Sequence, residues 1–288
     1  MNDDKFFKVT NENIEYSKHA KDGYSECFIG IIDILGYSDF VKNETDAIQV
    51  ITNLFEQTFF VNKLSLEDIS YKLLSDTLIV YTNDLEQYSL INLIYALDNF
   101  AINCVEHGFL TRGAIVKGNH YIYKDIMISP AFIKAYELEE KEANYPRILV
   151  TNEVYQALLK NLVEQNDCYS IRCQNNKKSI EFVKDLLEHD FDNWFVIRPF
   201  RNIEIIALCL YENYKDFRGN KFRRGIDNEE LISTLKRFQA GFKKIREKIK
   251  NNHVKGKFNY YARIFNDVLV KCNSFIDTSD LFIELFDF

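Results

Sequence analysis

Two aspartates, Asp33 and Asp76, stand where a carboxylate could hold a metal ion. Asp33 lies inside the apolar run ECFIGIIDILGYSDFV, residues 26–41, and Asp76 lies between two β-rich segments in KLLSDTLIV. An ionised carboxylate in an apolar run is costly unless it is paired or binds a metal. Carboxylates at matching ends of neighbouring strands, about 4.8 Å apart, can share divalent cations. Such ions activate a hydroxyl and neutralise triphosphate charge, which is the chemistry of phosphoryl transfer.

A purely structural explanation of both aspartates is equally open. Asp33 would cap the turn that follows its strand, and Asp76 would be an ordinary turn residue. Spacing alone favours neither explanation.

Alternating strands and helices are predicted to position these residues. Residues 28–34 form a continuous apolar run, which predicts a buried strand that ends in a turn at Gly36. The next predicted helix lies within residues 40–64 and places Ile48, Ile51, Leu54, Phe55 and Phe59 on one face. A hairpin is predicted next over 69–84, with Ser75–Asp76 at its turn, and then a helix over 87–108 that ends at Gly108. A strand or hairpin over 109–123 precedes a helix that begins at Ser129 and Pro130. The remaining predicted elements are a strand and a helix over 147–162, a strand-like stretch over 202–213, and helices over 228–253 and 258–276.

The order β-α-β-β-α-β-α-β through about Tyr155 predicts an α+β fold, a ferredoxin-like sheet with helices on one face. We expect an N-terminal segment over 1–25, a catalytic domain over 26–160, and a mixed, mainly helical C-terminal region over 161–288 packed on it.

Composition excludes several functional classes. The 288 residues are 47% hydrophobic with a formal net charge of -7, which argues against a general binder of nucleic acid or anionic membranes. No apolar run of about 18 residues predicts a membrane span, and the N-terminus does not resemble a signal peptide. The only close pair among the six cysteines, Cys168 and Cys173, has no matching second pair, which argues against zinc. These features predict a cytoplasmic protein with reduced cysteines.

Three motifs resemble those of the class III nucleotidyl cyclases. FIGIIDILGYSDF is similar to their first metal motif, KLLSDTLIV to their second, and TRGAIVKG to a later strand of that family. The resemblance implies that Asp33 and Asp76 coordinate two Mg²⁺ or Mn²⁺ ions and that the carbonyl of Ile34 adds a ligand. It also implies that backbone amides cradle the β- and γ-phosphates, namely those of Leu35, Gly36, Tyr37 and Ser38.

Within that superfamily the chain is most similar to the pyrimidine cyclases of bacterial Pycsar antiphage systems. The similarity rests on DILGYS, Ser-Asp-Thr in place of Gly-Asp, RGAIVKG, PAFIKAYELE followed by RILVTNEVY, and KFNYYARIFN. It implies a homodimer that converts UTP, or alternatively CTP, to its 3',5'-cyclic monophosphate, which then activates a separate effector. A purine cyclase or diguanylate-type synthase on the same fold, and a non-catalytic nucleotide sensor, are the alternatives.

One departure from the family concerns the cation that meets the developing charge on the α-phosphate. Class III cyclases carry Asn-x-x-x-Arg on the helix after the fourth strand, but this chain has SPAFIKAYELE there. A cation is still expected, because the developing charge must be met by a donor that is in place before reaction. Arg112 on the strand is the preferred replacement. Lys134 on the helix is a second candidate that also fits a solvated lysine. Lys72, four residues before Asp76, is either a base-reading residue or a lysine at a strand edge.

Overall fold

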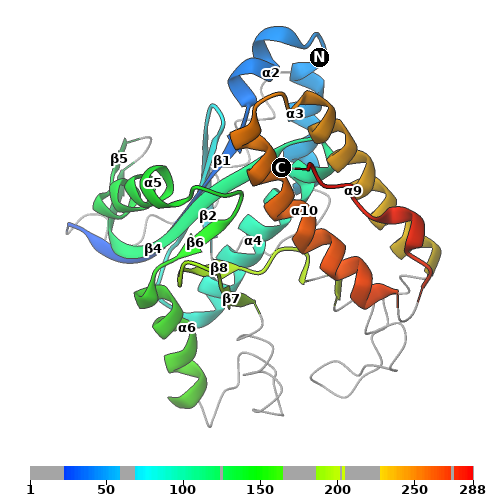
Figure 1. The fold of residues 1–288 in the computed structure, drawn as a ribbon. Coiled ribbons are helices and arrows are strands. Elements are labelled where there is room, and N and C mark those ends of the chain that lie inside the picture. The colour runs from blue at the N-terminus through cyan, green and yellow to red at the C-terminus, as the bar shows by residue number, and fades with distance from the viewer. Residues whose placement is uncertain are drawn as a thin grey trace.

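A computed structural model describes residues 23–58, 69–123, 126–164, 186–201, 203–204, 228–273 and 276–287. This part of the chain is built around a single mixed β-sheet with helices packed against it (Figure 1). The strands are β1 (Ser25–Leu35), β2 (Ile69–Leu74), β3 (Thr77–Thr82), β4 (Leu110–Tyr123), β5 (Ile126–Ile128), β6 (Ile148–Val150), β7 (Leu187–His189) and β8 (Phe195–Ile197). The helices are α2 (Tyr37–Asn43), α3 (Ala47–Glu56), α4 (Gln87–Glu106), α5 (Pro130–Glu142), α6 (Asn152–Glu164), α9 (Asn228–Lys248) and α10 (Asn252–Cys272), with a short 3-10 turn at Ser279–Leu281.

The strand order confirms the predicted ferredoxin-like arrangement. The sheet runs β2-β3-β1-β4-β6-β8-β7, and β5 pairs with β4. β1 pairs antiparallel with both β3 and β4, and β2 pairs antiparallel with β3. With α3 before β2 and α4 between β3 and β4, the first four strands form a split β-α-β unit. β6, which is parallel to β4, then extends the sheet to β8 and β7, which lie beyond residue 160.

Helices cover both faces of the sheet, so the prediction of helices on one face is wrong. On one face Ile32 and Ile34 of β1 pack in a core cluster with residues of α4. On the other face Ile29 and Ile31 pack with Ala131 of α5. The physical reason is visible in β1, where the apolar run is continuous and both faces of the strand therefore need cover.

Two turns and one helix cap form where short sequence signals predict them. Ser75 has a φ of 58° in the two-residue turn between β2 and β3, and Gly108 ends α4 with a φ of 87°. The Ser129 hydroxyl accepts a hydrogen bond of 3.0 Å from the N–H of Phe132, which caps α5 at its predicted start. Side-chain capping and positive φ values act over a few residues, so the sequence is sufficient to predict them.

The region predicted as one helix within residues 40–64 includes the end of one described helix, α2, and the whole of a second, α3. Leu54 and Phe55 are buried as expected, but Ile48 is 86% exposed at the start of α3. Phe59 lies outside the described residues. The strand-like stretch over 202–213 is wrong at Ile203 and Glu204, which are helical, and its remainder lies outside the described residues.

The C-terminal helices α9 and α10 form a second core with the end of α4, rich in aromatic side chains. Phe238 and Phe242 of α9 contact Phe265 of α10, with ring centroids 6.0 and 5.2 Å from it. Gly241 allows α9 to approach α4, because a Cβ at this residue would lie 1.8 Å from the carbonyl oxygen of Val105. This close approach places α9 directly against the end of α4.

Cys27, Cys104 and Cys272 are buried and unbridged in the described part of the chain. The other three cysteines, Cys168 and Cys173 among them, lie outside the described residues. Within the described residues no helix combines the length and apolar character needed to cross a membrane.

Candidate active site

Three strands bring Asp33, Thr77 and Arg112 into one row across the sheet. Asp33 of β1 pairs with Thr77 of β3 on one side and with Arg112 of β4 on the other. Residues paired in this way point to the same face of the sheet. That face is the one covered by α5, and the row lies at the end of β1, two residues before Leu35.

The hairpin turn places Asp76 beside this row. The backbone N–H of Ile34 donates a hydrogen bond of 3.2 Å to the backbone oxygen of Asp76. The turn between β2 and β3 therefore abuts the end of β1, and the carboxylates of Asp33 and Asp76 are close enough to repel each other. The structure thus brings together the two aspartates that the sequence singled out.

The pKa of Asp33 is raised above its ordinary value. Burial is the main cause, and the charge of Asp76 adds to it. Arg112, whose Nε lies 3.8 Å from Asp33 Oδ2, and a hydrogen bond from the Thr77 side chain offset part of the rise. A partly buried pair of like charges is a setting in which a divalent cation is favourable, because it would neutralise both groups.

The donor set fits a hard divalent cation that is completed by oxygen ligands from elsewhere. Among the described residues, no group of three or more His, Cys, Asp and Glu side chains is arranged to hold a metal ion. An ion at Asp33 and Asp76 would need further oxygens, such as the carbonyl of Ile34, substrate phosphates or water. These are the ligands that Mg²⁺ accepts when a protein supplies only one or two carboxylates.

The residues predicted to bind the phosphates come directly after Asp33 and Ile34 in the sequence. Leu35 ends β1, Gly36 has a φ of 80° and a ψ of 8°, and Tyr37 begins α2. Only glycine adopts this left-handed backbone without strain, so Gly36 allows the sharp turn from strand to helix. The first amides of a helix, here those of Tyr37 and Ser38, have no partner within the helix.

Glu139 is a member of this site that no sequence motif indicates. Its carboxylate forms an ion pair with Nε of Arg112, and the residue is only 3% exposed. Burial raises the pKa of Glu139 to about 7, although the charge of Arg112 lowers it. A signal was available, because Glu139 continues the spacing of Ala131 and Ala135, the buried residues of α5. A carboxylate on the buried side of a helix predicts a partner on the neighbouring strand.

Arg112 therefore stands between two carboxylates, Asp33 and Glu139. Glu139 holds the guanidinium from the side of α5, while Asp33 approaches it from β1. A guanidinium has five N–H donors, so contact at Nε leaves its terminal nitrogens able to bind a phosphate.

The two candidate lysines are placed differently. Lys72 pairs with Ile79, which pairs with Ile31, so Lys72 lies on the same face as Asp33 but further along the sheet. Its charge lowers the pKa of His120, after the larger effect of burial. Lys134 instead forms an ion pair of 2.9 Å with Glu153 of α6, and its side chain is 48% exposed. This is the contact of a solvated helix lysine.

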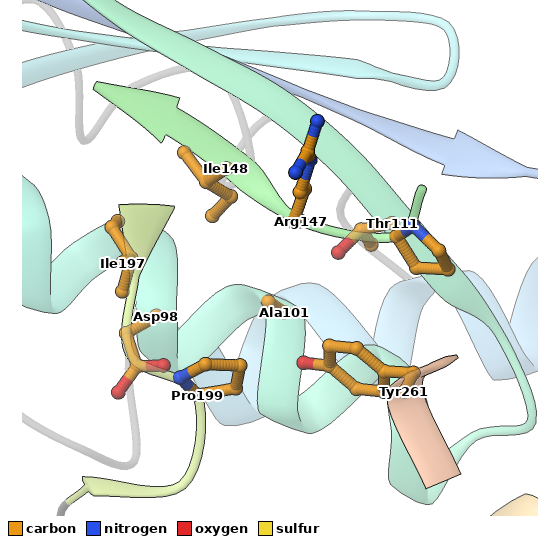
Figure 2. A pocket seen from close by; sticks show the side chains of 9 residues that line it. Asp98, Ala101, Thr111, Arg147, Ile148, Ile197, Pro199 and Tyr261 are labelled. Carbon is orange, nitrogen blue, oxygen red and sulfur yellow. The ribbon is translucent and has the colours of Figure 1, made fainter. Parts of the chain in front are cut away.

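A cavity elsewhere in the fold is too small for a nucleotide. It lies between α4, the start of β4, β6 and α10, and its volume is about 10 Å³, enough for a single water molecule (Figure 2). Asp98 and Tyr261 line it, and burial raises the pKa of Asp98 to about 8. The row at Asp33 is therefore the stronger candidate for nucleotide chemistry.

Comparisons with known proteins give similarity in structure only. No protein-family model and no curated protein sequence matches the chain. The adenylyl cyclase CyaB from P. aeruginosa matches 48% of this chain and 82% of its own, with 17% identity and a TM-score of 0.37. An adenylate/guanylate cyclase/hydrolase from Silicibacter pomeroyi gives the same coverages and TM-score with 15% identity. The guanylate cyclase domain of RhGC from Catenaria anguillulae, in complex with GTP, matches 47% of this chain and 82% of its own, with 12% identity and a TM-score of 0.36.

Proposed function

We propose that this protein is a nucleotidyl cyclase that acts on a pyrimidine nucleoside triphosphate, with UTP preferred and CTP as the alternative substrate. The observation that carries the proposal is the meeting of Asp33, Asp76 and Arg112 at one end of the sheet, beside the turn at Gly36. The pyrimidine substrate comes from the resemblance to the Pycsar cyclases.

The reaction joins two ends of one molecule. The 3'-oxygen of the ribose forms a bond to the α-phosphorus, the bond from that phosphorus to the bridging oxygen breaks, and diphosphate leaves. Asp33 and Asp76 would hold two Mg²⁺ or Mn²⁺ ions with the Ile34 carbonyl. Such ions, when bound, acidify the 3'-hydroxyl and neutralise phosphate charge.

The chain's own residues position the substrate and meet the charge. By the resemblance, amides at Leu35–Ser38 would bind the β- and γ-phosphates, at the left-handed turn that Gly36 makes between β1 and α2. Arg112, held by Glu139, would donate hydrogen bonds to the oxygens of the α-phosphate as their charge develops. Lys72 lies on the same face and is proposed to contact the base.

A direct assay tests the proposal. Pure protein is incubated separately with ATP, GTP, CTP and UTP in the presence of Mn²⁺, and the products are separated by chromatography. Cyclic UMP or cyclic CMP as the main product would support a pyrimidine cyclase, whereas a cyclic purine nucleotide or cyclic diguanylate would place the chain in another class. Binding without turnover would favour a nucleotide sensor.

The sensor remains a second candidate function because of two contacts. Arg112 is already paired with Glu139, and Lys134 of α5 is paired with Glu153. In the sensor alternative, both cations are structural and the site binds a nucleotide without cyclising it.

Replacing Arg112 by alanine tests its proposed role in the cyclase, whereas the sensor alternative predicts no turnover even in the wild type. If Arg112 acts on the developing charge, Arg112→Ala should lower kcat by about a hundredfold to a thousandfold with little change in KM. Lys117→Ala is the control, because Lys117 lies on the same strand and pairs with Glu26 at 3.2 Å. A raised KM at unchanged kcat would show that Arg112 contributes only to substrate binding.

We also propose that the active species is a homodimer. Class III cyclases, by resemblance, build each site across an interface, and this chain carries one set of motifs, so a second copy would supply the opposite wall. Light scattering under assay conditions should then give twice the chain mass of 34.0 kDa. A fully active species with the mass of one chain would contradict this prediction.

The biological role proposed from the resemblance is antiviral. Phage infection would trigger synthesis of the cyclic pyrimidine nucleotide, which would activate a separate effector that disables the host cell. Cells that carry Arg112→Ala together with the effector should lose protection against phage. Protection that survives the loss of cyclic nucleotide synthesis would separate the defence from the cyclase activity.

A further inference from the structure

The C-terminal helices reach the end of the sheet at which Asp33 and Arg112 lie. Leu35 of β1 pairs with Leu110 of β4, two residues from Asp33 and Arg112 respectively. Both leucines pack in the core cluster that contains Phe258 of α10. Figure 1 shows the beginning of α10 passing this end of the sheet. The first turns of α10 are therefore neighbours of the candidate site.

A second contact ties the junction of α9 and α10 to the helix after the predicted phosphate cradle. Lys248, the last residue of α9, places its Nζ 5.1 Å from the ring centre of Phe40 and 5.9 Å from that of Phe109. Phe40 belongs to α2, which begins directly after Gly36. The C-terminal helices thus adjoin the candidate site both at α2 and at the strand ends.

Lys257 lies on α10, one residue before the fully buried Phe258, and is itself partly buried. Its neighbour Phe258 packs in the same cluster as Leu110, which lies two residues from Arg112 on β4. In agreement with this placement, burial lowers the pKa of Lys257, and the charge of Arg112 lowers it further. Within the described residues Lys257 has no carboxylate partner. Four other lysines do have one, in the pairs Lys117–Glu26, Lys134–Glu153, Lys141–Glu137 and Lys271–Glu204. The described lysines without an ion pair include Lys243 and Lys244, but these are exposed to solvent, whereas Lys257 is partly buried.

A partly buried lysine beside an arginine is unfavourable unless an anion compensates it. Glu139 and Asp33 offset the charge of Arg112, and neither forms an ion pair with Lys257. A phosphate group placed between Lys257 and Arg112 would accept hydrogen bonds from both.

We propose that Lys257 binds the phosphate chain of the substrate, so that the C-terminal helices form one wall of the site in the same chain. The nature of the ligand, a nucleoside triphosphate, rests on the proposed function. The presence of an oligophosphate site rests on the juxtaposition of Lys257, Arg112 and the strand ends. The C-terminal region thereby has a role in binding as well as in packing.

The test uses inorganic tripolyphosphate, which carries the phosphate chain without base or ribose. Isothermal titration calorimetry of the full chain with Mg²⁺ measures its dissociation constant in the wild type and in Lys257→Gln. Loss of a charge-assisted hydrogen bond should weaken binding about tenfold to a hundredfold. Lys257→Arg should keep binding within about threefold of the wild type, because it retains the cation.

Arg263→Gln is the matched control, since it removes the same charge from an exposed position of the same helix. It should leave the dissociation constant unchanged, and circular dichroism should show equal folding of all variants. Equal binding by Lys257→Gln and the wild type would overturn the proposal, as would equal weakening by Arg263→Gln or no binding by the wild type.

The result is separable from that of the proposed function. If the wild type binds tripolyphosphate through Lys257 but makes no cyclic nucleotide, the proposed cyclase activity is contradicted and the oligophosphate site is supported. If the wild type is a cyclase and Lys257→Gln binds tripolyphosphate and turns over substrate equally well, the proposed activity is supported and the binding role of Lys257 is contradicted. With an active enzyme, Lys257→Gln should raise KM by about the same factor as the dissociation constant.

Discussion

Replacing either Asp33 or Asp76 by alanine is expected to abolish turnover and leave the protein folded. Asp33 lies near the end of β1 and Asp76 in the adjacent turn between β2 and β3, where the Ile34 N–H donates a hydrogen bond to the Asp76 carbonyl. If they hold the ions that activate the hydroxyl, losing either should lower kcat by about a thousandfold or more. The chromatographic assay with Mn²⁺ measures this effect.

The stability of these variants gives an independent check. Burial and Asp76 raise the pKa of Asp33, so its charged form is disfavoured in the folded protein. A carboxyl with a raised folded pKa loses stabilisation as pH rises above its unfolded value of about 4. Asp33→Asn, which keeps the shape and removes the charge, should therefore be at least as stable as the wild type at pH 7 in urea unfolding.

Added Mn²⁺ should raise the unfolding temperature of the wild type and not that of Asp33→Asn, because a ligand stabilises only the state that binds it. Wild-type turnover in either alanine variant would refute the metal-binding role of that residue. Unfolding of Asp33→Asn at pH 7 would instead support the purely structural explanation.

Replacing Gly241 by alanine is expected to destabilise the packing of α9 on α4. A Cβ would lie 1.8 Å from the Val105 carbonyl oxygen, an approach that requires the two helix backbones to separate. Alanine favours a helix interior over glycine by about 1 kcal/mol. Overpacking against a rigid neighbour costs about 1–3 kcal/mol or more, and a clash with backbone lies at the upper end. The clash should therefore outweigh the propensity.

We expect Gly241→Ala to lower the unfolding temperature by at least about 4 °C, measured by circular dichroism. Ala240→Gly is the matched control, because Ala240 is the exposed neighbour on the same helix and its change reverses the propensity effect. Propensity alone predicts opposite shifts for the two variants, whereas the clash predicts that both are destabilised. An unfolding temperature of Gly241→Ala at or above that of the wild type would contradict the close contact.

The sequence was sufficient for features that depend on neighbouring residues. The buried strand at 28–34, the turns at Gly36 and Ser75–Asp76, and the cap at Ser129 all follow from side-chain size, hydrogen bonding and backbone preference over a few residues. The order of strands and helices then allowed the ferredoxin-like topology to be predicted. Prediction failed at Ile48 because an apolar spacing does not say whether a partner surface exists.

The same distinction between local sequence and tertiary packing applies to the candidate site. By itself the sequence determined that Asp33 and Asp76 end neighbouring elements, since their local motifs specify strand and turn. Only the tertiary structure decided which cations and carboxylates join them. Arg112 meets Glu139 across 27 residues of chain, and α10 brings Lys257 toward Arg112 from the far end of the sequence. Such contacts depend on how α5 and α10 pack on the sheet, and packing is set by the shapes of whole surfaces that no local pattern records.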